Sequence, residues 1–132
     1  MTRDLIMELK DIQPSQLYIS SQKLDKVLEW FNPSDYDSYD AIPIKKLNGK
    51  IIFIDGHTRA YAAYLKGIES IKVYYWEEEE LSWDAYQICI DWCDSEGIKS
   101  IHDLKGRVIN PEEYETLWND RCRKMQKELG IY

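Results

Sequence analysis

The chain has 132 residues, 44% hydrophobic and 31% charged, with a formal net charge of −7. This length suits one domain with a substantial core, and the acidity disfavours a protein that grips duplex DNA through its phosphates. We find no signal peptide and no apolar run near the ~18 residues of a membrane span, so we expect a soluble, cytoplasmic protein.

The first half of the chain alternates between strand and helix patterns. Residues 5–12 favour a strand, and residues 24–31 carry an apolar stripe at helical spacing that Ser20 or Ser21 can cap. After a polar loop, two strands at 42–47 and 50–54 are expected to form a hairpin. Asn48-Gly49 between them tolerates positive φ at both turn positions. A helix at 57–66, closed by Gly67, and a strand at 71–76 complete this half.

The pattern turns helical beyond the acidic run at 77–80. Ser82 can cap one helix, Ser100 and Asp103 have capping-box spacing, and Asn110 can cap the last helix. The buried stripes of the two long helices are predicted to be Trp83, Tyr86, Ile90 and Cys93, and then Tyr114, Trp118, Cys122, Met125 and Leu129. We therefore expect an α/β domain over 1–80, with a helical extension over 81–132 packed on the same domain.

The three cysteines are Cys89, Cys93 and Cys122. Their spacing fits buried small apolar side chains, and no nearby histidines complete a four-ligand zinc set. We therefore predict no metal site built from these cysteines.

The strongest functional signal is Asp55-Gly56-His57-Thr58-Arg59, where an apolar strand runs into a helix. Gly56 allows a tight turn, and the first N–H groups of the helix are unpaired donors. The Arg59 guanidinium can donate two hydrogen bonds to a phosphate, and Thr58 adds a hydroxyl donor. Asp55 or His57 is the acid–base candidate. A structural reading is also open, in which Asp55 caps the helix, Gly56 only turns the chain and Arg59 is solvated.

The run Ile42-Pro43-Ile44, the hairpin and Ile54-Asp55-Gly56-His57-Thr58-Arg59-Ala60-Tyr61-Ala62-Ala63-Tyr64 resemble the core of the ParB/sulfiredoxin superfamily. The resemblance covers roughly residues 5–76 and implies a small mixed sheet with packed helices. It also implies that a nucleotide (ATP, ADP or CTP), with or without Mg²⁺, binds at the turn. Sulfiredoxins place a lysine of the preceding helix on the phosphates, and Lys23 is the equivalent here. Lys26 and Trp30 stand where that family has two hydroxyl contacts.

One departure from the family is decisive. Sulfiredoxins carry their nucleophilic cysteine directly after the glycine, and this chain has His57 there. Without a thiolate the sulfinic-acid repair chemistry is lost, so the chain is not a sulfiredoxin. The turn also comes near the Asp-Gly-x-His-Arg-like turn of small-molecule kinases in the superfamily, where an acid activates the substrate hydroxyl.

The sequence supports three hypotheses. The leading one is a nucleotide- or phosphate-binding domain, acting as a phosphotransferase or nucleotide hydrolase if it is an enzyme. The alternative is a non-enzymatic regulatory or DNA-associated module, for which the basic candidates are Arg107, Arg121, Arg123, Lys124 and Lys127. The third is a scaffold that binds a protein through aromatic side chains of its C-terminal half. The sequence does not decide the substrate, the metal, the oligomeric state or whether any turnover occurs.

Overall fold

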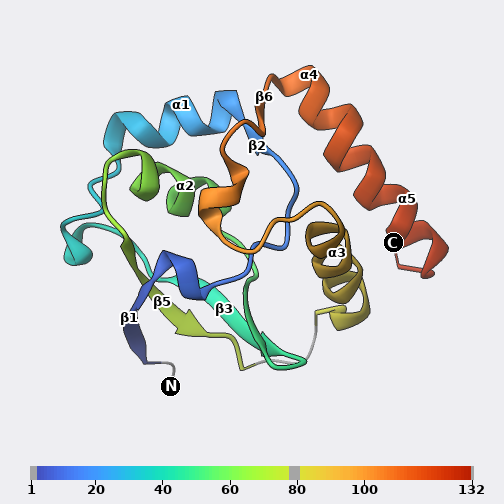
Figure 1. The fold of residues 1–132 in the computed structure, drawn as a ribbon, viewed down its shortest axis with the longest axis horizontal. Coiled ribbons are helices and arrows are strands. Elements are labelled where there is room, and N and C mark those ends of the chain that lie inside the picture. The colour runs from blue at the N-terminus through green and yellow to red at the C-terminus, as the bar shows by residue number, and fades with distance from the viewer. Residues whose placement is uncertain (1–2, 78–80, 132) are drawn as a thin grey trace.

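The computed structural model describes residues 3–77 and 81–131, and its fold is mixed α/β (Figure 1). The predicted boundary at residue 80 and most of the acidic run therefore lie outside the described residues. The strands are β1 (Asp4–Glu8), β2 (Ile19–Ser20), β3 (Ile42–Leu47), β4 (Lys50–Phe53), β5 (Ser70–Tyr75) and β6 (Val108–Ile109). The α-helices are α1 (Ser21–Trp30), α2 (His57–Leu65), α3 (Trp83–Ser95), α4 (Pro111–Tyr114) and α5 (Asp120–Glu128).

The main sheet has four strands in the order β1-β5-β3-β4. β5 is parallel to β3, and both outer pairs are antiparallel, so the sheet is mixed. The predicted hairpin is confirmed: Asn48 and Gly49 have φ of 50° and 82°. The predicted strand at 5–12 is only partly right, because β1 ends at Glu8 and a 3₁₀ turn at Leu9–Asp11 buries Leu9. A second 3₁₀ turn, Tyr36–Ser38, lies within the predicted polar loop.

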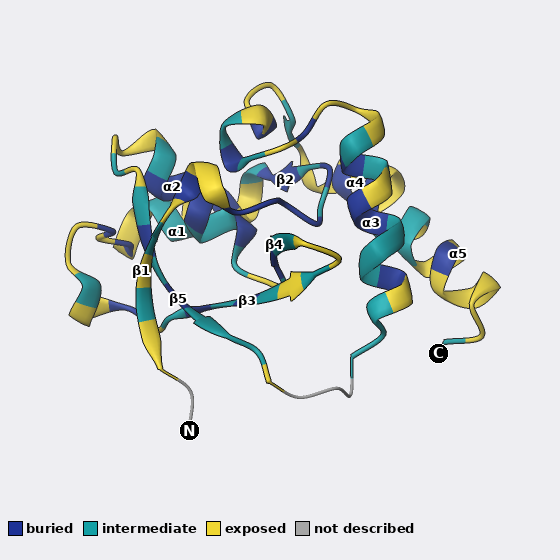
Figure 2. Ribbon diagram, turned by 60° about the horizontal axis from the view of Figure 1, so that its bottom comes forward, coloured by how far each residue is buried: buried dark blue, intermediate teal, exposed yellow. Residues whose placement is uncertain are grey.

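Helix α2 packs against the main sheet at β5, and α1 packs against α2. Figure 2 shows α2 largely buried, whereas β1 alternates between exposed and half-buried residues. Ala60, Ala62 and Ala63 are fully buried, and these small side chains let α2 approach the sheet closely. Ser20 caps α1 by accepting from Lys23 N–H at 3.4 Å, which confirms one of the two predicted caps.

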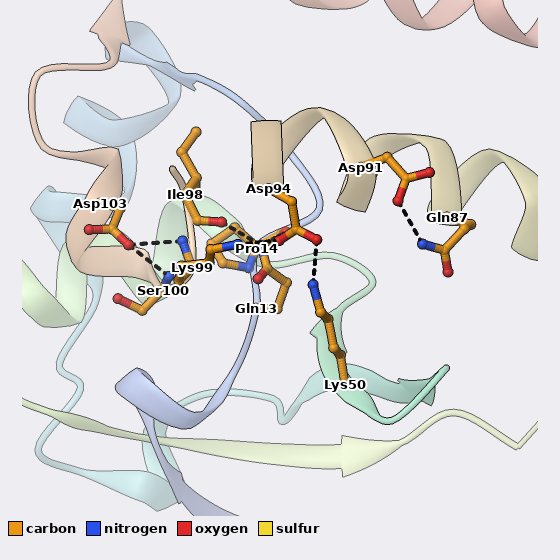
Figure 3. Close-up of polar contacts among 10 residues, drawn as sticks. All are labelled: Gln13, Pro14, Lys50, Gln87, Asp91, Asp94, Ile98, Lys99, Ser100 and Asp103. Carbon is orange, nitrogen blue, oxygen red and sulfur yellow. Dashed lines mark hydrogen bonds and ion pairs between the residues drawn. The ribbon is translucent and has the colours of Figure 1, made fainter. Parts of the chain in front are cut away.

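The C-terminal helical segment packs on the same body. Gln13, which pairs with the edge of β4, donates from Nε2 to Ile98 O at 2.7 Å. Lys50 of β4 forms an ion pair with Asp94 of α3, and both contacts are drawn in Figure 3. The predicted caps at Ser82 and Asn110 are present, and the Asp103 carboxylate accepts from Ser100 N–H at 3.2 Å.

The last helix is continuous from Pro111 to Glu128, with a π-helical turn at Glu115–Asn119 between α4 and α5. Tyr114, Trp118 and Met125 are buried as predicted, but Leu129 is exposed. Leu129 is the C-cap residue that follows α5, so it lies at the end of the helix, beyond the last buried residue of the stripe, Met125. Within residues 3–77 and 81–131, no helix combines the length and apolarity needed to cross a bilayer.

Candidate functional site

All six residues predicted for the site line one cavity of about 390 Å³, which we call the turn cavity. They are Lys23, Asp55, Gly56, His57, Thr58 and Arg59. The lining also includes Gln16, Lys26, Val27, Trp30 and Tyr114. The cavity lies between one side of α1, the turn and first residues of α2, and α4.

Two parallel strands explain why α1 and α4 meet here. β2 pairs in parallel with β6 in the register Ile19 to Val108 and Ser20 to Ile109. Each strand leads directly into a helix, so α1 and α4 begin at the same edge of this two-stranded sheet. Lys23 Nζ consequently lies 5.3 Å from the centre of the Tyr114 ring, in a cation–π contact across the cavity.

Gly56 forms the turn, and two independent features of the structure favour glycine at this position. Its φ is +78°, in the left-handed region that favours glycine. A Cβ placed on it would also lie 2.7 Å from Ile42 Cγ2, closer than side-chain carbons pack. The Gly56 N–H donates to Asp55 Oδ1 at 2.8 Å, so Asp55 has a structural role in the turn as well as an exposed carboxylate.

The helix α2 starts without a side-chain cap. Its first intrahelical bond runs from Ala60 N–H to Gly56 O at 3.0 Å. The N–H groups of His57, Thr58 and Arg59 therefore have no acceptor within the helix, and they carry the positive end of the helix dipole. Thr58 is half-buried in the wall of the turn cavity, at this positive end.

Arg59 is oriented by a backbone contact. Its Nη1 donates to Asp40 O at 2.8 Å, and the side chain lines both the turn cavity and a neighbouring hollow beside Trp30 and Tyr39. This bond uses one of the five guanidinium donors and leaves the others for a ligand. The guanidinium is thus fixed at the cavity wall.

His57 is buried, and its environment identifies its protonation state. Ser15 N–H donates to His57 Nε2 at 2.9 Å, which places the imidazole proton on Nδ1. Burial lowers the pKa of His57 to about 4, so the ring is neutral at pH 7. Because Nε2 already accepts a backbone hydrogen bond, this arrangement makes Asp55 the more accessible of the two predicted acid–base residues.

The turn cavity is cationic within an acidic chain. Lys23, Lys26 and Arg59 contribute three positive charges and Asp55 one negative charge, so the lining has a formal charge of +2, against −7 for the whole chain. Such a concentration of cations with open backbone donors is suited to an anion. Within the described parts of the chain, no three His, Cys, Asp or Glu side chains converge as a metal site.

Gln16 and Tyr114 line the cavity but were not identified as site residues from the sequence. Gln16 Nε2 donates to the Tyr114 hydroxyl at 3.1 Å, and burial raises the pKa of Tyr114 to about 12. The phenol is therefore neutral and keeps its own proton to donate. Tyr114 was predicted only as part of a buried stripe, and no local signal in the sequence places it beside Lys23.

No protein-family model and no curated protein matches the sequence. Among solved structures, protein Atu1540 from Agrobacterium tumefaciens is similar, with a TM-score of 0.53 and 14% identity over 79% of this chain. The chain covers 62% of the length of Atu1540. At this identity the likeness shows a shared fold alone.

Proposed function

We propose that the chain is a nucleotide- or phosphate-binding domain of the ParB/sulfiredoxin superfamily, and that the turn cavity binds the phosphate groups. The observation that carries this proposal is the convergence of Lys23, Arg59 and the uncapped start of α2 on one cavity. Lysine and arginine side chains together with free backbone N–H groups are the usual ligands of a phosphate. The three cysteines are free thiols, which suits the cytoplasm, where we propose that the protein acts.

The rim of the cavity also suits a nucleobase. Trp30 lines the cavity and is 57% exposed, which is unusual for so large an apolar side chain. Its ring packs edge-on against Phe31, with the centroids 5.5 Å apart. Bases stack on exposed aromatic faces, so we expect the base to lie on Trp30 while the phosphates extend toward Arg59.

If the domain catalyses a reaction, phosphoryl transfer or nucleotide hydrolysis fits these residues. Such reactions depend mainly on positioning and on neutralising phosphate charge, which Lys23 and Arg59 would supply. The Asp55 carboxylate would accept the proton of the attacking hydroxyl or water. Mg²⁺ is often held by one carboxylate together with substrate phosphates, and the exposed Asp55 fits that requirement.

Isothermal titration with ATP, ADP and CTP, with and without Mg²⁺, tests the proposal. We expect saturable binding of at least one nucleotide, and a loss of about tenfold or more in Arg59→Ala, as for a charge-assisted contact. Lys105→Ala is a control that removes a positive charge from an exposed position outside the cavity. The absence of heat with all three nucleotides, in both conditions, would overturn the proposal.

A second titration separates the base from the phosphates. Trp30→Ala should weaken nucleotide binding several-fold, since stacking contributes about 1–3 kcal/mol per base, and should leave inorganic pyrophosphate unaffected. An equal loss for both ligands would argue against stacking on Trp30.

The DNA-associated alternative receives less support from the described side chains. Arg107 and Arg121 both pair with Glu96, at 2.9 and 3.7 Å, and Arg123 pairs with Glu115 and Asp120. Cations already paired with carboxylates offer less attraction to a phosphate backbone. A gel shift that weakens steeply with added salt would restore this alternative.

A further inference from the structure

A second cavity, of about 420 Å³, lies between α3 and the C-terminal helix, and we call it the thiol cavity because Cys89 and Cys122 both line it. Tyr86, Trp118 and Met125 contribute to the same wall. No described residue of this lining is Asp, Glu, Lys or Arg. Among the thiols, Cys122 is the partly exposed one, whereas Cys89 is buried.

The packing of the two helices fixes how the thiols meet. Trp92 of α3 contacts Trp118 edge-on, with ring centroids 6.0 Å apart, and the Arg121 guanidinium lies 4.1 Å from the centre of the Trp92 ring. Cys89 precedes Trp92 by three residues on α3. Cys122 follows Trp118 by four residues on the C-terminal helix. These steps each correspond to about one helical turn, so the two cysteines occupy the next level of an antiparallel helix pair.

The two thiols are chemically unequal. The side-chain contact with Cys89 lowers the pKa of Cys122 and its partial burial raises it, while the charges of Arg121 and Arg123 lower it further. The same contact, together with burial, raises the pKa of Cys89. The thiolate is the reactive form, and Cys122 is also the partly exposed member of the pair, so of the two it is better placed to react first.

The third cysteine, Cys93, can be compared with Cys89 and Cys122 within the same protein. Cys93 lies one turn from Cys89 on α3, is fully buried, and donates from Sγ to Gln16 O at 3.7 Å. Burial raises the pKa of Cys93 to about 12. It does not line the thiol cavity, so it has neither access nor the thiolate character needed for reaction.

We propose that Cys122 is a hydroperoxide-reactive thiol and that Cys89 resolves it, forming a disulfide that joins α3 to α5. In the first step the Cys122 sulfur attacks the peroxide, an S–O bond forms, the O–O bond breaks, and one water or alcohol leaves. In the second step the Cys89 sulfur attacks Cys122, an S–S bond forms, the S–O bond breaks, and a water leaves. Two thiols are oxidised and one hydroperoxide is reduced to two hydroxyl products.

The test uses the full reduced chain treated with one equivalent of hydrogen peroxide, alkylated and mapped by mass spectrometry without reduction. We expect a peptide that links Cys89 to Cys122, with Cys93 fully alkylated. In Cys89→Ser, Cys122 should accumulate as a sulfenic acid that a 1,3-dione traps, about tenfold or more faster than Cys93. Cys93→Ser should form the disulfide as the native chain does.

The native peptide map decides the proposal even if a variant does not fold. A disulfide that includes Cys93, a disulfide only between two chains, or no oxidation of Cys122 would each overturn it. Far-ultraviolet circular dichroism of Cys122→Ser and Cys122→Ala shows whether either variant retains the fold. A folded variant of this kind that still formed the intrachain disulfide through Cys89 would also contradict the assignment.

Discussion

The two cavities differ in chemistry although they are nearly equal in size, about 390 and 420 Å³, and they share a wall of Gln16 and His57. The turn cavity gathers three cations and one carboxylate, whereas the described lining of the thiol cavity has no formally charged side chain. Volume alone would not distinguish them. The two cavities differ because different helix termini and different side chains line each side of the shared wall.

The shared wall is built to stay neutral. His57 is buried, accepts from Ser15 N–H and has its pKa lowered to about 4, while the hydroxyl of Ser15 donates to Phe53 O at 2.6 Å. A charged imidazole here would lack hydration on either side. The comparison teaches that a buried neutral ring can separate a cationic surface from an uncharged one within a small domain.

The largest effect is expected from Gly56→Ala, which removes the turn that gives the first cavity its shape. A left-handed φ and contact with Ile42 together should cost about 4 kcal/mol of the free energy of unfolding. Gly49→Ala, where φ is +82° but nothing lies within 4 Å of the added Cβ, should cost about 1 kcal/mol. Urea unfolding of both variants measures the difference, and equal losses would mean that Ile42 yields to the new methyl group.

Acid should lower the free energy of unfolding, because His57 in the shared wall becomes protonated. Its pKa is about 4 in the folded chain and 6.5 ordinarily, so protonation favours the unfolded state. The neutral ring contributes up to about 3 kcal/mol to the free energy of unfolding. This contribution is complete above pH 6.5 and is lost as the pH falls to about 4. His57→Gln keeps an acceptor for Ser15 N–H without titrating. The stability difference between the two proteins should therefore narrow over this range, and a constant difference would place the acid sensitivity elsewhere.

Met125→Ala tests whether the thiol cavity serves stability alone. Met125 is buried and lines that cavity, so its truncation should cost about 2 kcal/mol in urea unfolding. Nucleotide affinity, measured by titration under conditions where the variant is folded, should not change. A parallel loss of affinity would show that the two cavities are coupled across Gln16 and His57.

The smallest effect is expected from Asp55→Asn, and its sign should depend on Mg²⁺. Removing the single carboxylate of the turn cavity should strengthen nucleotide binding a few-fold without Mg²⁺, since an exposed charge interaction is worth about 0.2–1 kcal/mol. With Mg²⁺ the same variant should bind more weakly if Asp55 shares the ion with the phosphates. Asparagine retains an acceptor for Gly56 N–H. A uniform change in both conditions would exclude a metal at Asp55.

The local elements could be predicted from sequence because their causes are local. Asn48-Gly49 determines its own turn, and Ser82 and Asn110 cap their helices with their own side chains. The exposure of Leu129 could not be predicted from the helical period, because the period does not say where the helix ends, and Leu129 is the C-cap that follows α5. β1 ends earlier than its apolar pattern suggests because Leu9 turns into the core, with its N–H bonded to Glu69 O at 2.8 Å.

One side of the candidate site was predicted from the turn sequence and from a family resemblance. The opposite wall, which Tyr114 supplies, was not predicted. Lys23 and Arg59 lie in the predicted cavity, but Tyr114 reaches it only because β2 pairs with β6. That pairing is a tertiary contact between two very short strands, each with a weak pattern of its own. A two-residue strand gives too little periodicity to be recognised from sequence.

The β2–β6 pairing also sets an order for the assembly of the protein during synthesis. Gln16 and Tyr114 are 98 positions apart, so the segment that carries Gln16, Lys23 and Arg59 leaves the ribosome well before its last partner. Until Tyr114 has emerged, the turn cavity of the nascent chain lacks the wall that this residue supplies. The wall that Tyr114 supplies is thus completed late, because the contacts that close the cavity join segments far apart along the chain.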